Sequence, residues 1–158
     1  MKKILKLTMV LLGALFVLLG CSSETKSEFV LQKTASKTKL TYVYDKEKDS
    51  VSKLTMEIIY DITKDERYTE AVRSQRDEIV SEMEGIEGVT YTKKDDINYI
   101  TLTIEVDVNK FKFDDAASRK KAPTLYNTVN AALKRKDNMV SYQLSKDAIL
   151  EYEFKEVK

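Results

Sequence analysis

Histidine is missing from this 158-residue sequence, and cysteine and proline occur once each. Histidine is the commonest general acid or base and the commonest metal ligand near neutral pH. Its absence leaves only carboxylates, lysines and tyrosines for chemistry, and four glycines leave little for a phosphate-binding loop. We therefore expect no enzymatic activity, no cofactor and no metal centre.

The first twenty residues have the composition of a secretory signal. Lys2, Lys3 and Lys6 form a basic head, and residues 7–20 form an apolar segment. That segment has about 14 residues, short of the roughly 20 that cross a bilayer core as a helix. The sequence therefore predicts export, with a segment too short to span the membrane.

The single cysteine, Cys21, directly follows Leu18, Leu19 and Gly20 at the end of the apolar segment. Leu18 can fill an apolar peptidase pocket, and Gly20 allows the backbone to approach the protease closely. This order resembles the lipobox of bacterial lipoproteins, which implies cleavage after Gly20 and a diacylglyceryl group on Cys21. Two acyl chains anchor a protein stably to a membrane. The alternative is an ordinary cleaved signal or short anchor in which Cys21 has no role.

Removal of the signal changes the charge balance and sets the domain boundaries. Three of the 27 lysines and arginines precede the cut, which leaves 24 against 26 acidic residues. A nearly neutral chain argues against a nucleic-acid partner. We expect a signal peptide at residues 1–20, a lipidated tether at 21–28 and one domain at 29–158. Lysine-rich, glycine-poor and proline-poor usage fits a Gram-positive bacterium.

Alternating apolar and polar residues predict an antiparallel sheet of about five strands, at residues 29–32, 40–44, 54–61, 89–91 and 100–108. One face of the sheet should be buried and the other should face water. Ile59 interrupts the polar side of the third strand, so part of that side is expected to be covered.

Helical spacing predicts one long helix between the third and fourth strands. Residues 63–66 form a capping box, Gly85 is a likely stop, and the apolar stripe comprises Tyr68, Val72, Gln75, Ile79 and Met83. Shorter helices are expected from Pro123 and from an N-cap at Ser145, followed by an extended tail. The expected class is α+β, with about five strands packed against one long helix and shorter C-terminal helices.

Several segments resemble the YehR-like small bacterial lipoproteins. They are CSS at residues 21–23, LTYVYDKEKDSV at 40–51, GIEGVTY at 85–91 and SKDAILEYEFKEV at 145–157. The resemblance implies a lipoprotein with this family's fold, and it carries over no catalytic or ligand-binding residue. The family often has glycine before the phenylalanine of the tail, where this sequence has Glu153.

Several polar and aromatic clusters in the sequence have spacings that can form binding sites. Asp45, Glu47 and Asp49 have the spacing that opens a calcium loop, but Ser50 and Met56 stand where glycine and glutamate are required. We interpret the aspartate pairs at 95–96 and 114–115 as solvated loop residues. The basic run at 119–121 is interpreted as a surface segment, and the tyrosines of the strands as core residues.

The combined interpretation is a non-enzymatic binding or interaction module, anchored at the extracytoplasmic face of the cell membrane. Its partners would be membrane lipid, through the diacylglyceryl group on Cys21, and an unknown protein or small molecule. The alternative is an accessory component that delivers a small ligand or ion to a membrane transporter. A pocket with converging polar groups would favour a ligand, whereas a shallow apolar patch would favour a protein partner.

Overall fold

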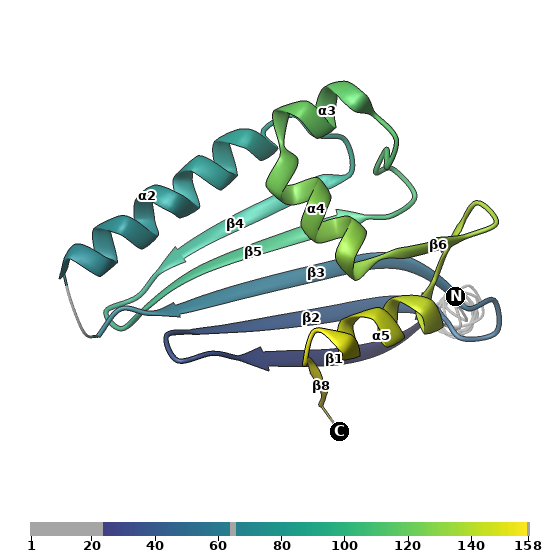
Figure 1. Cartoon of the computed structure of the whole chain (residues 1–158), viewed down its shortest axis with the longest axis horizontal. Coiled ribbons are helices and arrows are strands. Elements are labelled where there is room, and N and C mark those ends of the chain that lie inside the picture. The colour runs from purple at the N-terminus through teal and green to yellow at the C-terminus, as the bar shows by residue number, and fades with distance from the viewer. Residues whose placement is uncertain (1–23, 64–65, 158) are drawn as a thin grey trace, which may run out of the picture.

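The computed structural model describes residues 24–63 and 66–157. Figure 1 shows an open, twisted sheet with helices against one face. All strand pairs are antiparallel, in the order β4-β5-β3-β2-β1-β8, while β7 pairs with both β3 and β6. The strands are β1 Glu24–Gln32, β2 Ser36–Asp45, β3 Ser50–Asp61, β4 Val89–Asp95, β5 Tyr99–Asp107, β6 Lys134–Lys136, β7 Met139–Ser141 and β8 Lys155–Glu156.

Alternation along the three central strands separates two faces of the sheet. The covered face, which lies against the helices, carries the buried side chains of Leu40, Tyr42, Leu54, Met56, Leu102 and Ile104. The open face, opposite to it, carries Lys39, Thr41, Thr55, Glu57, Thr101 and Thr103. Leu40 pairs with Met56, and Met56 pairs with Ile104, so the buried residues of three strands form continuous rows.

The helices are α2 Glu66–Met83, α3 Ala116–Lys121, α4 Pro123–Ala132 and α5 Tyr142–Glu151. The expected α+β class is present, but the expected arrangement of about five strands against one long helix is wrong. The sheet has eight strands, and no single long helix covers it, because four helices in the described part of the chain share that role. Strands of two or three residues contain too few side chains to show a period, so the sequence does not predict β6 and β7, whereas β8 lies within the expected extended tail.

The buried stripe of helix α2 overlaps the expected one only in part. Val72, Val80 and Met83 are buried, but Gln75 is exposed and Arg76, which is not part of the expected stripe, is only 6% exposed. Arg76 is drawn inward because its guanidinium donates to Asp95 at the end of β4. An ion pair between α2 and β4 therefore sets the rotation of the helix, which apolar spacing alone does not reveal.

Strand β1 begins at Glu24, inside the segment expected to be a tether. Residues 24–28 pair with residues 41–45 of β2, so this part of the expected tether belongs to the sheet, and the domain begins before residue 29. Residues 24–28 are mostly polar because they lie near the sheet edge, so the sequence shows no alternation that would predict a strand there. In the sequence only Ser22 and Ser23 separate Cys21 from β1.

The C-terminal tail returns to the sheet edge directly after α5. Glu153 has φ of 67°, a left-handed conformation that favours glycine. The chain therefore makes a turn of the kind that favours glycine with a glutamate at this position. After the turn, Phe154 packs against the core, and β8 pairs with Phe29 and Val30 of β1.

Candidate functional site

The residues expected to carry lipidation lie outside the described part of the chain. Leu18, Leu19, Gly20 and Cys21 all precede Glu24, the first described residue. Among the described helices, none is both long enough and apolar enough to cross a membrane. The described residues contain no cluster of three or more His, Cys, Asp or Glu side chains placed to hold a metal ion.

The calcium-like spacing in the turn between β2 and β3 has structural uses. Asp45 Oδ1 accepts hydrogen bonds from the backbone N–H groups of Glu47 and Lys48, at 3.0 and 3.2 Å. These bonds, led by the one from Lys48, lower the pKa of Asp45. Asp49 Oδ1 instead accepts from the N–H of Gln143 at 2.8 Å, in the first turn of α5. The two carboxylates therefore bind different segments.

The paired aspartates also have separate partners. Asp95 pairs with Arg73 and Arg76 of α2, and Asp114 pairs with both terminal nitrogens of Arg135, at 2.6 and 2.9 Å. The hydrogen bonds from Arg135 lower the pKa of Asp114. Asp115 caps α3 by accepting from two backbone N–H groups. Neither pair forms a shared carboxylate site.

The basic run Arg119, Lys120 and Lys121 forms the last turn of α3 and remains on the surface. The Arg119 guanidinium donates to the Phe113 carbonyl at 2.8 Å and lies 5.9 Å from the centre of the Tyr126 ring. Arg119 therefore contacts neighbouring protein groups rather than projecting freely into solvent.

Most strand tyrosines pack on the covered face, as the sequence indicated. Tyr42 is fully buried, and its hydroxyl donates to the Ala132 carbonyl at 2.8 Å. Tyr44 stacks on Tyr142 with ring centres 3.5 Å apart. Tyr99 differs, because it starts β5 with 46% of its surface exposed. It marks a pocket that the other tyrosines do not reach.

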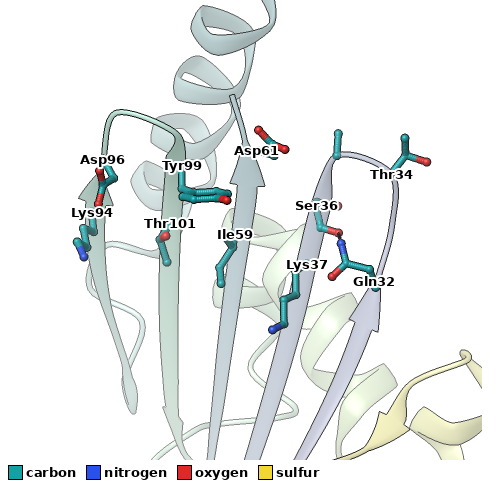
Figure 2. Close-up of a pocket in the computed structure, with 11 residues that line it drawn as sticks. Gln32, Thr34, Ser36, Lys37, Ile59, Asp61, Lys94, Asp96, Tyr99 and Thr101 are labelled. Atoms are coloured by element: carbon teal, nitrogen blue, oxygen red, sulfur yellow. Dashed lines mark hydrogen bonds between the residues drawn. The ribbon is translucent and has the colours of Figure 1, made fainter. Parts of the chain in front are cut away.

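The distal pocket lies on the open face, at the end of the sheet far from Glu24. Its volume is about 430 Å³, within the range typical of small-ligand sites. One row of the sheet crosses it: Lys37 of β2 pairs with Ile59 of β3, which pairs with Thr101 of β5, which pairs with Lys94 of β4. Figure 2 shows Ile59 and Thr101 between the two lysines. Ile59, the apolar exception on the polar side of β3, is thus part of the pocket lining.

The Tyr99 ring lies across the distal pocket beyond this row. Tyr99, the first residue of β5, pairs in the sheet with Asp61, the last residue of β3. Figure 2 shows the Tyr99 ring extended from β5 towards β3. The remaining wall comes from the turns after β1 and β4 and carries amide, hydroxyl and carboxylate groups: Gln32, Thr34, Ser36 and Asp96. An aromatic ring therefore lies among converging polar groups.

Backbone hydrogen bonds fix the segments that form the distal pocket. Asp61 N donates to the Ala35 carbonyl at 3.0 Å, and Ile62 N donates to the Asn98 carbonyl at 2.9 Å. Both neighbouring turns are thereby tied to the end of β3. Because these bonds form within the protein alone, little ordering of the backbone is needed when a ligand binds.

The aspartates and the lysines of the distal pocket differ in whether they have hydrogen-bond or ion-pair partners within the described part of the chain. Asp61 Oδ1 accepts from the backbone N–H and the hydroxyl of Thr63, at 3.0 and 2.7 Å. Asp96 Oδ1 accepts from the N–H of Ile97 at 2.7 Å. In contrast, Lys37 and Lys94 have no carboxylate partner among residues 24–63 and 66–157. The pocket therefore contains two lysines without a carboxylate partner among the described residues and two carboxylates that accept from neutral donors, so its formal charges balance.

A second cavity, the apolar groove, lies on the other side of the sheet. It has a volume of about 590 Å³ and runs between α4, the end of α5 and the covered face. Its apolar lining includes Leu31, Leu40, Met56, Ile58, Ile149 and Phe154. The half-buried side chains of Leu31 and Ile58 face this groove because four helices leave part of the covered face without a lid.

The comparisons with known proteins establish the fold. No known family profile and no curated protein sequence matches this chain. The NMR structure of Escherichia coli YehR aligns with a TM-score of 0.64 at 19% identity, covering 85% of this chain and 91% of YehR. The NMR structure of a protein from Streptococcus pneumoniae TIGR4 aligns with a TM-score of 0.56 at 12% identity, covering 87% of each chain. The chain therefore has a YehR-like fold.

Proposed function

We propose that this chain is a membrane-anchored bacterial lipoprotein that works as a non-enzymatic binding module at the extracytoplasmic face. Cys21 carries the diacylglyceryl anchor after cleavage behind Gly20. The distal pocket binds the partner. Lysines, hydroxyls, an amide and an exposed ring line this pocket, and both of its carboxylates already accept hydrogen bonds in neighbouring turns. Such a lining favours recognition over general acid or base chemistry.

The observation that carries this proposal is the position of the distal pocket, which lies at the end of the sheet opposite to Glu24, where β1 begins. Three residues from Cys21 to Glu24 span at most roughly 10 Å, so the start of β1 stays near the membrane. Gln32 ends the same strand and lines the pocket. Eight residues of strand extend roughly 27 Å. An anchor on Cys21 would therefore hold the sheet by the end opposite to the pocket, which leaves the pocket accessible to a partner in the envelope.

The test combines acyl labelling with position-specific cross-linking on living cells. A photoreactive residue replaces Thr34 at the distal pocket or, as the control, Lys26 at the anchor end of the same sheet face. We expect acyl label in the wild-type chain, none in Cys21→Ala, and a discrete cross-linked species only from position 34. Retained label and normal maturation in Cys21→Ala would refute the anchor. Equal cross-linking from both positions would refute the pocket as the binding site.

The apolar groove favours the alternative function, delivery of a small ligand to a membrane transporter. Its side chains would accommodate an apolar molecule on the covered face. In that case solvent extraction of the purified full-length protein should release a stoichiometric apolar compound. Replacement of Ala131 by Phe in the groove should prevent its recovery, while Thr34→Ala at the distal pocket should not. Recovery of the compound from both variants would argue against the groove as its site.

A further inference from the structure

We propose that the distal pocket binds an acidic saccharide, a chain of sugar units that carries carboxylate or phosphate groups. This inference rests on the proposed function in one respect, the choice of the distal pocket as the binding site. Three features support it: an exposed aromatic ring, hydroxyl groups without a side-chain partner, and two lysines without a carboxylate partner, both in the part of the chain that the structure describes.

Tyr99 provides the surface for a sugar ring. The face of an aromatic ring is electron-rich, and the C–H groups on one face of a pyranose carry slight positive charge, so the two stack favourably. Tyr99 is 46% exposed, and Figure 2 shows its ring lying across the pocket. The other strand tyrosines that reach the core are covered by helices, so Tyr99 is the ring placed for this contact on the open face.

Hydroxyl groups around the ring match those of a sugar. The side chains of Thr34, Ser36 and Thr101 line the distal pocket, and none of their hydroxyls has a side-chain hydrogen-bond partner among the described residues. A hydroxyl both donates and accepts, as sugar hydroxyls do. Such groups can therefore pair with both the donors and the acceptors of a saccharide, and they add no charge to the pocket.

The two lysines indicate an acidic and extended ligand. Lys37 and Lys94 lie in one row with two strands between them, so their Cα atoms are on the order of 14 Å apart. Figure 2 shows the two lysine side chains on separate strands with Thr101 and Ile59 between them, so in this arrangement one small anion would contact one lysine rather than both. A chain of sugar units with acidic groups at separate positions can contact both lysines while one unit stacks on Tyr99. Charge-assisted hydrogen bonds to the lysines are stronger than neutral ones.

The experiment measures binding to the full-length protein, purified in detergent, by titration calorimetry. The probes are trigalacturonate, which is an acidic saccharide, maltotriose, a neutral saccharide of the same length, and triglutamate, an acidic chain without sugar rings. We expect only trigalacturonate to bind at millimolar concentration. Binding should weaken as salt is added, because the lysines are exposed to solvent.

Matched variants connect the binding to the distal pocket. Tyr99→Ala and Lys94→Gln should each weaken trigalacturonate binding about tenfold, the size of one aromatic stack or one charge-assisted hydrogen bond. The controls are Tyr152→Ala, at a 58% exposed ring on the helical side, and Lys26→Gln, at the opposite end of the open face. They should bind as the wild type does. Unchanged melting temperatures would show that all four variants are folded.

Each contrary result overturns a stated part of the inference. Equal binding of maltotriose would remove the requirement for an acidic group, and equal binding of triglutamate would remove the requirement for a sugar. No binding of trigalacturonate would end the proposal. In that case cross-linking from position 34 would still support an anchored binding module with another ligand, whereas retained label in Cys21→Ala concerns only the anchor.

Discussion

The covered face and the open face of the sheet consist of alternate residues of the same strands, yet their chemistry differs. Leu54 is fully buried on the covered face, next to rings and helices. The adjacent Thr55 lies on the open face, in a row that runs from Thr41 through Thr55 to Glu105. Apolar contact determines the first environment, whereas hydrogen bonds and ion pairs with water nearby determine the second.

This difference separates stability from binding. The register that buries the covered face also aligns Lys37, Ile59, Thr101 and Lys94 on the open face, although none of these four contributes to the fully buried core. Substitutions in the distal pocket should therefore change binding without unfolding the protein. Substitutions on the covered face should instead lower the free energy of unfolding.

The strongest test of this separation substitutes two neighbouring residues of β3. Leu54→Ala should lower the free energy of unfolding by about 3 kcal/mol, because it removes buried methyl groups and leaves a cavity. Thr55→Ala should change it by less than about 0.5 kcal/mol. Chemical denaturation of both variants measures the two values. Similar losses at the two positions would contradict the separation of stability from binding.

The long elements of the fold were predictable from sequence because each contains several periods. Alternation found the five longest strands, and Pro123 marked the start of α4. Gly85, with φ of 74°, stands just after α2 as expected. Local chemistry is sufficient in these cases because the signal is repeated within one element.

Short and long-range features were not predictable in the same way. Helix α5 begins after Ser141 rather than Ser145, because Asp49, from a turn about ninety residues earlier, accepts from the first turn of α5. The hairpin of β6 and β7 turns through Asp137 and Asn138, with φ of 52° and 68°, a geometry common in two-residue hairpins. Each depends on one turn or one distant contact, so no periodic pattern precedes it.

The distal pocket shows the same limit. Ile59 was recognised as an exception on the polar side of β3, and the structure places it between Lys37 and Thr101. Only the register across four strands brings Lys94 and Tyr99 to the same place. A single sequence contains the residues of this pocket but not their pairing.

Alkaline pH tests the covered face through Tyr42. Burial, with a smaller contribution from Tyr142, raises the pKa of Tyr42 above its ordinary value of 10.0. The folded state then holds the phenol proton more tightly than the unfolded state does. This contribution to stability is complete below pH 10 and is lost as pH rises towards the folded pKa, at up to about 1.4 kcal/mol per pH unit.

Tyr42→Phe isolates that contribution. At neutral pH the variant should lose about 1 to 2 kcal/mol, because the Ala132 carbonyl loses its donor in a buried site. Above pH 10 its stability should fall less steeply than that of the wild type. Thr55→Ala, on the open face, should keep the wild-type slope. Denaturation curves between pH 8 and pH 11 measure this, and identical slopes for wild type and Tyr42→Phe would contradict the assigned cause.

The smallest expected effect compares one ion pair from each side of the sheet. Lys39 and Glu57 pair across β2 and β3 on the open face at 3.2 Å, with both side chains about one-third exposed. A double-mutant cycle with alanine should give a coupling of about 0.5 kcal/mol or less, and added salt should reduce it. The smaller coupling is thus expected on the open face.

The matched cycle is Arg76 with Asp95, on the helical side, where Arg76 is only 6% exposed. The coupling energy of Arg76 with Asp95 should exceed that of Lys39 with Glu57 and respond less to salt, because water screens a buried guanidinium less effectively. Equal couplings with equal salt dependence would show that the environments of the two faces are electrostatically alike, and the separation of stability from binding would then have to rest on apolar packing alone.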